Sequence, residues 1–203
     1  CYKVLCGSNA LALKGFSFRR CNMLANSIPE VDEVYADAQK ALESIADAYS
    51  VRRAERKDIP SVVRINRLCL PENYSVGFFE DLLETYSKAF FVAVHREEGV
   101  IGYVMCRVEV KKGFFSEEKL RSLHIVSIAV MPKHRRRKLG YALMAYAMKS
   151  GKRDYNCCES YLEVRVSNEP AINLYKRLGY SIITVIPQYY LDGEDAYLMA
   201  RPI

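Results

Sequence analysis

Two kinds of hydrophobic pattern alternate along this chain, short apolar runs and longer segments with apolar residues at helical spacing. The runs are rich in β-branched and aromatic residues, as is typical of strands. The two runs at 90–94 and 100–108 are close enough to predict an antiparallel hairpin. Because strands alternate with helical segments, we predict an α/β fold with a mixed central sheet flanked by helices on both faces. The runs lie at residues 50–54, 90–94, 100–108, 124–132, 161–166 and 180–186.

The helical segments have recognisable ends. Residues 30–48 form an acidic amphipathic pattern that predicts one helix. A second helix is expected to begin after Asp58, which suits a cap, to tolerate Pro60 in its first turn, and to end before Pro71. Gly179 is a plausible stop for the last helix, because glycine readily adopts the left-handed conformation found after helix ends.

A strongly basic turn joins a strand to a helix between His124 and Tyr141. Leu139 and Leu143 begin the helical spacing, so the turn lies at a helix N-terminus, where unpaired N–H groups and the helix dipole attract anions. Gly140 would let a ligand approach the backbone closely, which favours a pyrophosphate as the guest. A solvated charge run or a nucleic-acid patch is the alternative. The four consecutive cations are Arg135, Arg136, Arg137 and Lys138.

A second strand and short helix follow at residues 161–180, and the two pairs together resemble the GNAT superfamily of N-acetyltransferases. In that family an Arg-x-x-Gly-x-Gly/Ala motif binds the pyrophosphate of acetyl-CoA, and residues 137–142 fit it. Counted from Pro132, the loop is two residues longer than usual, so the choice of phosphate-binding arginine stays open. The resemblance implies acetyl-CoA as cofactor and a GNAT fold of about seven strands. The implied cofactor contacts are Ile128, Ala129, Val130, Arg135, Arg136, Arg137, Lys138, Leu139, Gly140, Tyr141, Ala142, Asn168, Asn173 and Tyr175.

Two further motifs narrow the resemblance. L-C-L-P-E-N-Y at 68–74 and P-Q-Y-Y-L-D-G-E-D-A-Y-L-M at 187–199 resemble the NatA-type amino-terminal acetyltransferases and their archaeal homologues. Kinship with the bacterial ribosomal-protein acetyltransferase is also visible. The likeness predicts an acetyltransferase domain at 49–203 preceded by an N-terminal extension at 1–48, partly helical. The substrate-binding residues that it implies are Leu70, Pro71, Glu72, Tyr74, Tyr189 and Tyr190.

Composition is consistent with a compact enzyme. The chain has 203 residues, of which 50% are hydrophobic, enough to bury a full core. The apolar run in the first sixteen residues is interrupted by polar residues, so we expect no export signal, and no segment reaches bilayer-spanning length. Seven cysteines show neither metal-ligand spacing nor a secreted disulfide framework. We therefore expect no metal site and a reducing, cytoplasmic setting.

The net charge of +6 is concentrated in residues 133–153. An anionic cofactor would account for much of this excess. RNA is the competing partner, because clustered lysines and arginines attract phosphates without regard to sequence. The chain has no recognisable nucleic-acid-binding motif, so no specific nucleic-acid partner is expected.

Attack of an amine on a thioester needs a neutral nucleophile, a stabilised oxyanion and a proton for the leaving thiolate. An α-amino group has a pKa of about 7.7 to 8.0 against about 10.4 for lysine, so an N-terminus needs only a weak base. The resemblance implies three candidate bases, and their order stays open. Glu163 lies in a strand with one polar face, His124 begins the other central strand, and Glu72 lies in the L-P-E-N-Y loop. Each has an ordinary structural alternative, as a solvated or packed polar side chain.

Tyr175 follows Asn168 by seven residues, the spacing at which the family places its thiolate-protonating tyrosine and a coenzyme-contacting asparagine. The spacing equals about two helical turns, so the two residues share nearly one face. A core aromatic is the alternative for Tyr175. The family further implies that a backbone N–H near 128–130, where its central strands splay apart, holds the oxyanion.

The prediction is therefore transfer of acetyl from acetyl-CoA to the α-amine of protein N-termini through a ternary complex. Tyrosines on two loops suit an extended peptide better than a long lysine stem. A lysine, polyamine or small-molecule acetyltransferase remains open, as does a basic RNA-binding module without catalysis. Protein N-termini are the expected partners, with the ribosome or an auxiliary subunit as further candidates and no membrane.

Overall fold

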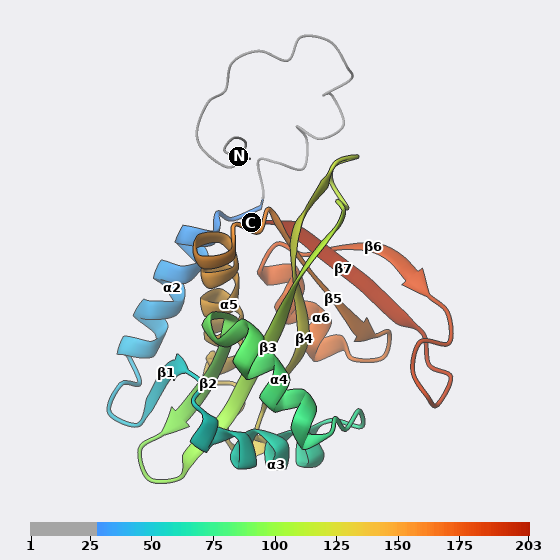
Figure 1. Cartoon of the computed structure of the whole chain (residues 1–203). Helices are drawn as coiled ribbons and strands as arrows, with labels where there is room; N and C mark the ends of the chain where they lie inside the picture. Colours follow the sequence, from blue (N-terminus) through green and yellow to red (C-terminus); the bar gives the residue numbers. More distant parts are fainter. Residues whose placement is uncertain (1–27) are drawn as a thin grey trace.

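One sheet of seven strands, in the order β1-β2-β3-β4-β5-β7-β6, forms the centre of the molecule (Figure 1). The computed structural model describes residues 28–203. Predictions for the first 27 residues, including the start of the extension and the expected absence of an export signal, concern residues outside the described range. All neighbouring strands are antiparallel except β4 and β5, which confirms the predicted mixed sheet. The strands are β1 Tyr49–Arg53, β2 Phe90–His95, β3 Gly99–Lys112, β4 Lys119–Val130, β5 Glu159–Arg165, β6 Ser181–Ile186 and β7 Ala196–Pro202.

Helices cover both faces of this sheet. On β3, Val104 packs in the same apolar cluster as α5, whereas Tyr103 and Met105 pack in the cluster that contains α3 and α4. Successive strand residues point to opposite faces, so the two clusters lie on opposite sides of the sheet. No helix among residues 28–203 is long and apolar enough to cross a membrane. The helices are α2 Val31–Glu43, α3 Ile59–Cys69, α4 Val76–Tyr86, α5 Leu139–Tyr155 and α6 Glu169–Arg177, with short 3-10 turns η1 Arg56–Asp58, η2 Ser87–Ala89 and η3 Pro132–His134.

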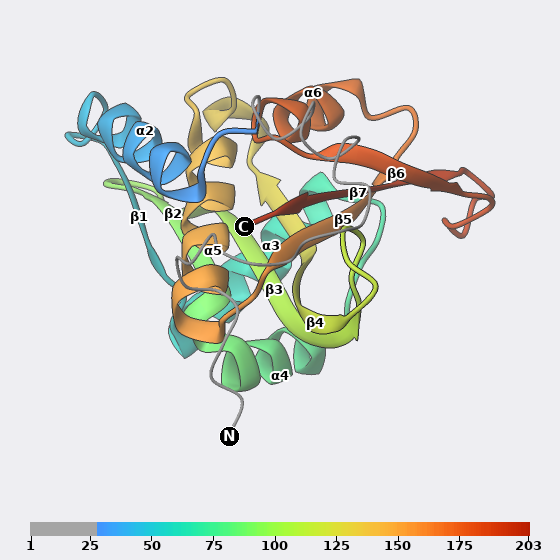
Figure 2. The same cartoon turned by 90° about the horizontal axis from the view of Figure 1, so that it is seen from above.

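Helix α2 packs beside α5, as Figure 2 shows. Val31, Val34 and Ala38 are at most 1% exposed and belong to the same apolar cluster as α5. The helix ends at Glu43, five residues earlier than the pattern to residue 48 predicts. Ser44 explains the early end, because its hydroxyl donates to a backbone carbonyl of the last turn at 2.8 Å and the following residues form turns.

The central strands β4 and β5 separate part-way along their length. Their parallel pairing covers only three residue pairs and ends at His124 opposite Tyr161, although β4 continues to Val130 and β5 to Arg165. Beyond that point β4 keeps its pairing with β3 alone. The separation opens the middle of the sheet beside the first turn of α5, where the predicted catalytic strands meet.

Candidate active site

The centre of the candidate site is a hydrogen bond between His124 and Glu163. His124 Nε2 lies 2.7 Å from Glu163 Oε2, and the two side chains are only 9% and 14% exposed. His124 forms the last β4–β5 pair with Tyr161, and Glu163 follows two residues later on the same face of β5. The structure thus brings together two of the three predicted bases where the strands separate.

An aromatic ring fixes the orientation of His124. The Tyr161 ring lies nearly parallel to the imidazole, at 9° and with 4.4 Å between centroids. The Tyr161 hydroxyl donates to Glu109, and burial together with that carboxylate raises the pKa of Tyr161 far above its usual value. The phenol therefore stays protonated and hydrogen-bonded, and it holds the imidazole against rotation.

Two residues of β3 that the sequence analysis did not single out, Arg107 and Glu109, also reach this network. Arg107 is the β3 partner of His124, and its Nε donates to His124 Nδ1 at 3.2 Å. Glu109 Oε1 lies 2.5 Å from the same Arg107 Nε. Burial alone would raise the pKa of Glu109, but the Tyr161 hydrogen bond and the charge of Arg107 hold it below its ordinary value. The alternating pattern of β3 places both residues on a polar face, but it does not show which residues of the neighbouring strand lie opposite them.

Glu72, the third predicted base, is held by an arginine on β5. Arg165 Nη2 donates to Glu72 Oε1 at 2.6 Å and Nε donates to the same oxygen at 3.2 Å. The other end of the guanidinium binds Asp192 and Glu194 in the β6–β7 loop, at 2.7 Å and 2.6 Å. Arg165 therefore joins the L-P-E-N-Y loop to the second tyrosine-bearing loop. The alternating polar face of β5 includes Arg165, but this pattern alone did not predict its role between the two loops.

The three predicted tyrosines line the space beside these carboxylates. Tyr190 lies over the Arg165 guanidinium, with 4.1 Å from Cζ to the ring centroid, and its ring is 5.0 Å from that of Tyr189. Burial raises the pKa of Tyr189 to about 12, with a further contribution from the charge of Glu163. Burial likewise raises the pKa of Tyr74, and the carboxylates of Glu72 and Glu163 add to the effect. Tyrosines of both loops therefore lie within range of the electric field of Glu163.

The turn before α5 has the geometry of an anion cradle. Arg136 and Lys138 adopt left-handed backbone conformations, with φ of 66° and 60°. The bond from Ala142 N to Lys138 O is the first of the helix, so the preceding N–H groups have no intrahelical acceptor. The four basic side chains are exposed, and Arg135 Nε binds Val130 O at 2.9 Å. The predicted basic turn at a helix N-terminus is therefore confirmed.

Helix α6 carries Asn168 and Tyr175 near its two ends. Asn168 is the N-cap, and its Oδ1 accepts from Ala171 N at 3.3 Å, while the N–H groups of its side-chain amide make no hydrogen bond within residues 28–203. Tyr175 is 6% exposed, and burial raises its pKa, so the phenol is protonated at neutral pH. Asn173 is exposed on the same helix. Helix α6 also approaches the cradle, because a Cβ at Gly140 would lie 3.4 Å from Leu174 Cδ2.

The other predicted contacts lie around the same opening. The residues expected to hold the oxyanion form the end of β4, and those of the basic motif form the first turn of α5. Leu70 and Pro71 follow α3, with Leu70 half-buried and Pro71 exposed. The residues at the end of β4 are Ile128, Ala129 and Val130, and those in the first turn of α5 are Leu139, Gly140, Tyr141 and Ala142.

Comparisons with known proteins identify the family of this chain. Residues 59–180 match the model of the Acetyltransferase (GNAT) family. The chain belongs to this family. An N-alpha-acetyltransferase of Sulfurisphaera tokodaii is 49% identical to this GNAT chain over 173 residues, covering 83% of this chain and 99% of that protein.

Solved structures resemble this GNAT domain in the same way. Ard1 from Thermoplasma volcanium is 32% identical, with a TM-score of 0.66 over 77% of this chain and 98% of that chain. Naa20 from Chaetomium thermophilum in complex with a bisubstrate analogue is 29% identical, with a TM-score of 0.66 over 76% of this chain and 86% of that chain. The expected fold and family are therefore confirmed.

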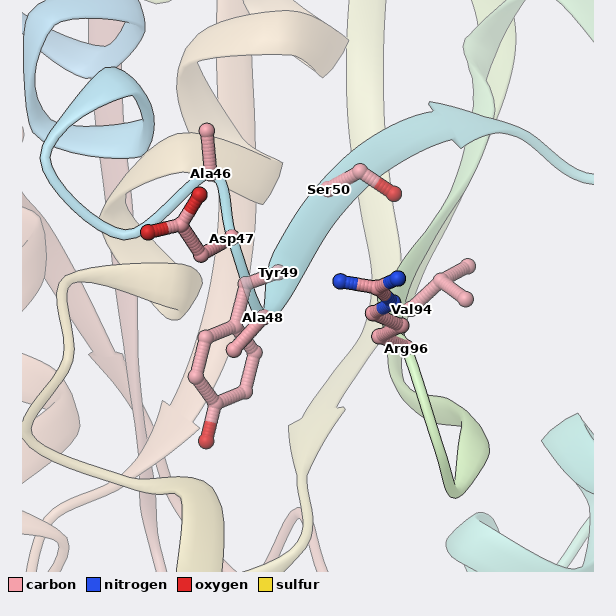
Figure 3. A pocket seen from close by; sticks show the side chains of 7 residues that line it. All are labelled: Ala46, Asp47, Ala48, Tyr49, Ser50, Val94 and Arg96. Carbon is pink, nitrogen blue, oxygen red and sulfur yellow. The ribbon is translucent and has the colours of Figure 1, made fainter.

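A separate hollow of about 400 Å³ lies at the edge of the GNAT sheet, between the end of α2 and β2 (Figure 3). Asp47 and Arg96 lie on opposite sides of it in that view. Residues 46–50, Val94 and Arg96 line it. Because this set includes none of the candidate catalytic or peptide-binding residues, the hollow is distinct from the site around Glu163.

Proposed function

We propose that this GNAT protein transfers an acetyl group from acetyl-CoA to the α-amino group of protein N-termini, by direct attack within a ternary complex. The observation that carries the proposal is the His124–Glu163 hydrogen bond at the strand separation, next to two tyrosine-bearing loops that Arg165 joins. A carboxylate with a tightly held histidine partner can accept the proton of an amine there. The names of the S. tokodaii relative and of the Naa20 complex support the same reaction.

The chain's residues fit acetyl-CoA as the acetyl donor, whose thioester supplies the electrophilic carbonyl. The open N–H groups at the start of α5 and the exposed cations at 135–138 suit its pyrophosphate. The unpaired side of β4 at 128–130 offers backbone groups at the strand separation for the carbonyl oxygen. Asn168 and Asn173 are the proposed contacts on α6.

Glu163 is the proposed base in this reaction. Its carboxylate is 14% exposed, which leaves it room to receive a proton directly or through one water molecule. An α-amine is partly neutral near pH 8, so an ordinary carboxylate suffices, whereas a lysine amine would need a stronger base. His124 is proposed to orient Glu163.

Glu72 and the tyrosines are proposed to hold the peptide N-terminus. Both Arg165 bonds reach Oε1 of Glu72, and Oε2 makes no hydrogen bond to residues 28–203, which leaves it for the substrate amine. Tyr74, Tyr189 and Tyr190 are proposed to pack around the first residues of the peptide, with Leu70 and Pro71 completing the wall. Their protonated hydroxyls can bond the peptide backbone.

Tyr175 is proposed to protonate the departing thiolate. The raised pKa keeps a proton on its hydroxyl at neutral pH, and that hydroxyl is not committed to any acceptor among residues 28–203. Donation of this proton to the departing sulfur lets coenzyme A leave as a thiol, which is a better leaving group than a thiolate.

We further propose that the enzyme acts in the cytoplasm and that its substrates include ribosomal proteins, met at the ribosome or through an auxiliary subunit. The exposed cations at 135–138 belong to the cofactor cradle and could contact RNA only while the cradle is empty, so a stable ribosome contact needs a second surface. Co-sedimentation with ribosomes in the presence of saturating CoA tests this, since CoA would occupy the cradle and leave only a separate ribosome contact.

An acetyl-transfer assay tests the main proposal. Labelled acetyl-CoA is offered with peptides that begin Ser, Ala, Met-Leu or Met-Glu, and with N-blocked peptides that contain an internal lysine. We expect transfer to free N-termini only. Transfer to the blocked peptides alone would show that the substrate is a lysine amine. Thermal stabilisation by RNA rather than by CoA would favour an RNA-binding module without catalysis.

A further inference from the structure

Both ring nitrogens of His124 have defined partners, and this determines where its proton lies. Nδ1 receives the Nε–H of Arg107 at 3.2 Å, while Nε2 lies 2.7 Å from Glu163 Oε2. An arginine Nε carries a hydrogen at all relevant pH values and cannot accept one. Nδ1 must therefore offer its lone pair, and the ring proton resides on Nε2, from which it is donated to Glu163.

We propose that Arg107 is a positioning residue of the reaction, which fixes the Nε2–H tautomer of His124 and so makes Glu163, rather than His124, the base. This inference rests on the proposed function for its catalytic meaning. With Nε2 already protonated, the imidazole has no lone pair on the side of Glu163. The carboxylate accepts the imidazole hydrogen bond and keeps its remaining lone pairs for the substrate amine.

The opposite tautomer would disable the pair. Without the Arg107 donor, Nδ1–H could turn to Glu109, whose Oε1 lies 3.7 Å from Nδ1. The lone pair of Nε2 would then face the Glu163 carboxylate at 2.7 Å, so that two acceptors oppose each other. The contact would survive only with an extra proton between them, and that proton would occupy the base before the substrate arrives.

A closed ring of contacts holds Arg107 in place. Glu109 forms an ion pair with the Arg107 guanidinium and also accepts from the Tyr161 hydroxyl, and Tyr161 stacks on His124. Glu109 remains charged, since its pKa lies below the ordinary value. Each member thus restrains the next, and the Arg107 donor stays directed at Nδ1 although its side chain is 42% exposed.

Three substitutions of Arg107 separate the donor from the charge. Arg107→Gln places an N–H at the same number of bonds from Cα as the arginine Nε, without the charge. Arg107→Lys keeps the charge but has a methylene at that position, and Arg107→Met has neither. The chain contains three histidines, so the ring nitrogens of ¹⁵N-histidine-labelled protein can be assigned by NMR with His95→Gln and His134→Gln.

We expect the Nε2–H tautomer and a turnover number within about threefold of the parent in Arg107→Gln. In Arg107→Lys and Arg107→Met we expect the tautomer to change and kcat to fall about 10- to 100-fold, with KM for acetyl-CoA unchanged. An unchanged tautomer in Arg107→Met, or full activity in Arg107→Lys, would overturn the proposal. A rise in peptide KM at constant kcat would overturn it too, by making Arg107 a substrate contact. The NMR readout needs no substrate, so it stands apart from any failure of the proposed reaction.

Discussion

Glu163→Gln isolates proton transfer from geometry at the proposed catalytic centre. An amide oxygen can still accept the His124 Nε2–H bond, which is 2.7 Å long, so the side chain and its partner should keep their places. The amide cannot take up the proton of the attacking amine. The expected loss is therefore the acid–base contribution alone, without a misplacement of the substrate.

The size of the loss follows from the chemistry of the substrate amine. A positioned base contributes about 10²- to 10⁴-fold, and we expect the lower end because an α-amine is already partly neutral near pH 8. A fall in kcat of about 100-fold corresponds to about 2.7 kcal/mol of transition-state stabilisation. The Michaelis constants for acetyl-CoA and peptide should change little, because the carboxylate is assigned to neither binding site.

Initial rates with saturating acetyl-CoA and a titrated peptide measure this prediction. Glu118→Gln is the matched control, since it makes the same chemical change at an exposed position whose side chain takes part in no ion pair among residues 28–203. The control should retain the parent kcat. A Glu163→Gln enzyme within about threefold of the parent, with an unchanged melting temperature, would refute the assignment of the base.

Four further predictions test other parts of the account. Gly140→Asp should abolish CoA binding in calorimetry by placing a carboxylate in the cradle, whereas Gly140→Ala, whose Cβ would stand 3.4 Å from its neighbour, should bind nearly normally. Tyr175→Phe should lower kcat at constant KM in steady-state assays while leaving the melting temperature unchanged, because the hydroxyl bonds nothing within residues 28–203. Arg165→Met should raise the peptide KM by about tenfold or more and leave CoA binding unchanged, because it releases Glu72 from the second loop. An equal loss of peptide and CoA binding would contradict the assignment of Arg165 to the peptide side of the site. Arg201→Met should lower the free energy of unfolding in urea by about 3 kcal/mol, because this 2% exposed guanidinium donates to three backbone carbonyls that would lose their donor; a change under about 1 kcal/mol would contradict that role.

Local pattern predicted most of the fold, because the relevant signals are short-range. The hairpin of β2 and β3 and the end of α3 before Pro71 are as expected. Gly179, with φ of 85°, follows α6 as predicted. Helix α4 was not predicted, although Phe79 and Leu82 mark its buried face.

The candidate site was predictable only where a motif named its residues. Glu163, His124 and Tyr74 were expected from such motifs, and the structure places them around one opening. Arg107 and Arg165 could not be expected, because their roles depend on which strands and loops become neighbours. Strand register is decided by packing across the whole sheet and leaves no local mark beyond a polar face. The order of the candidate bases was undetermined for the same reason.

The most direct test of the central claim is a competition within one peptide. A peptide with a free N-terminal serine and one internal lysine is incubated with acetyl-CoA and the enzyme, and fragment masses locate the acetyl group at low conversion. We expect acetylation of the α-amine, with the lysine unmodified until the N-terminus is consumed. Acetyl found first on the lysine side chain would contradict it.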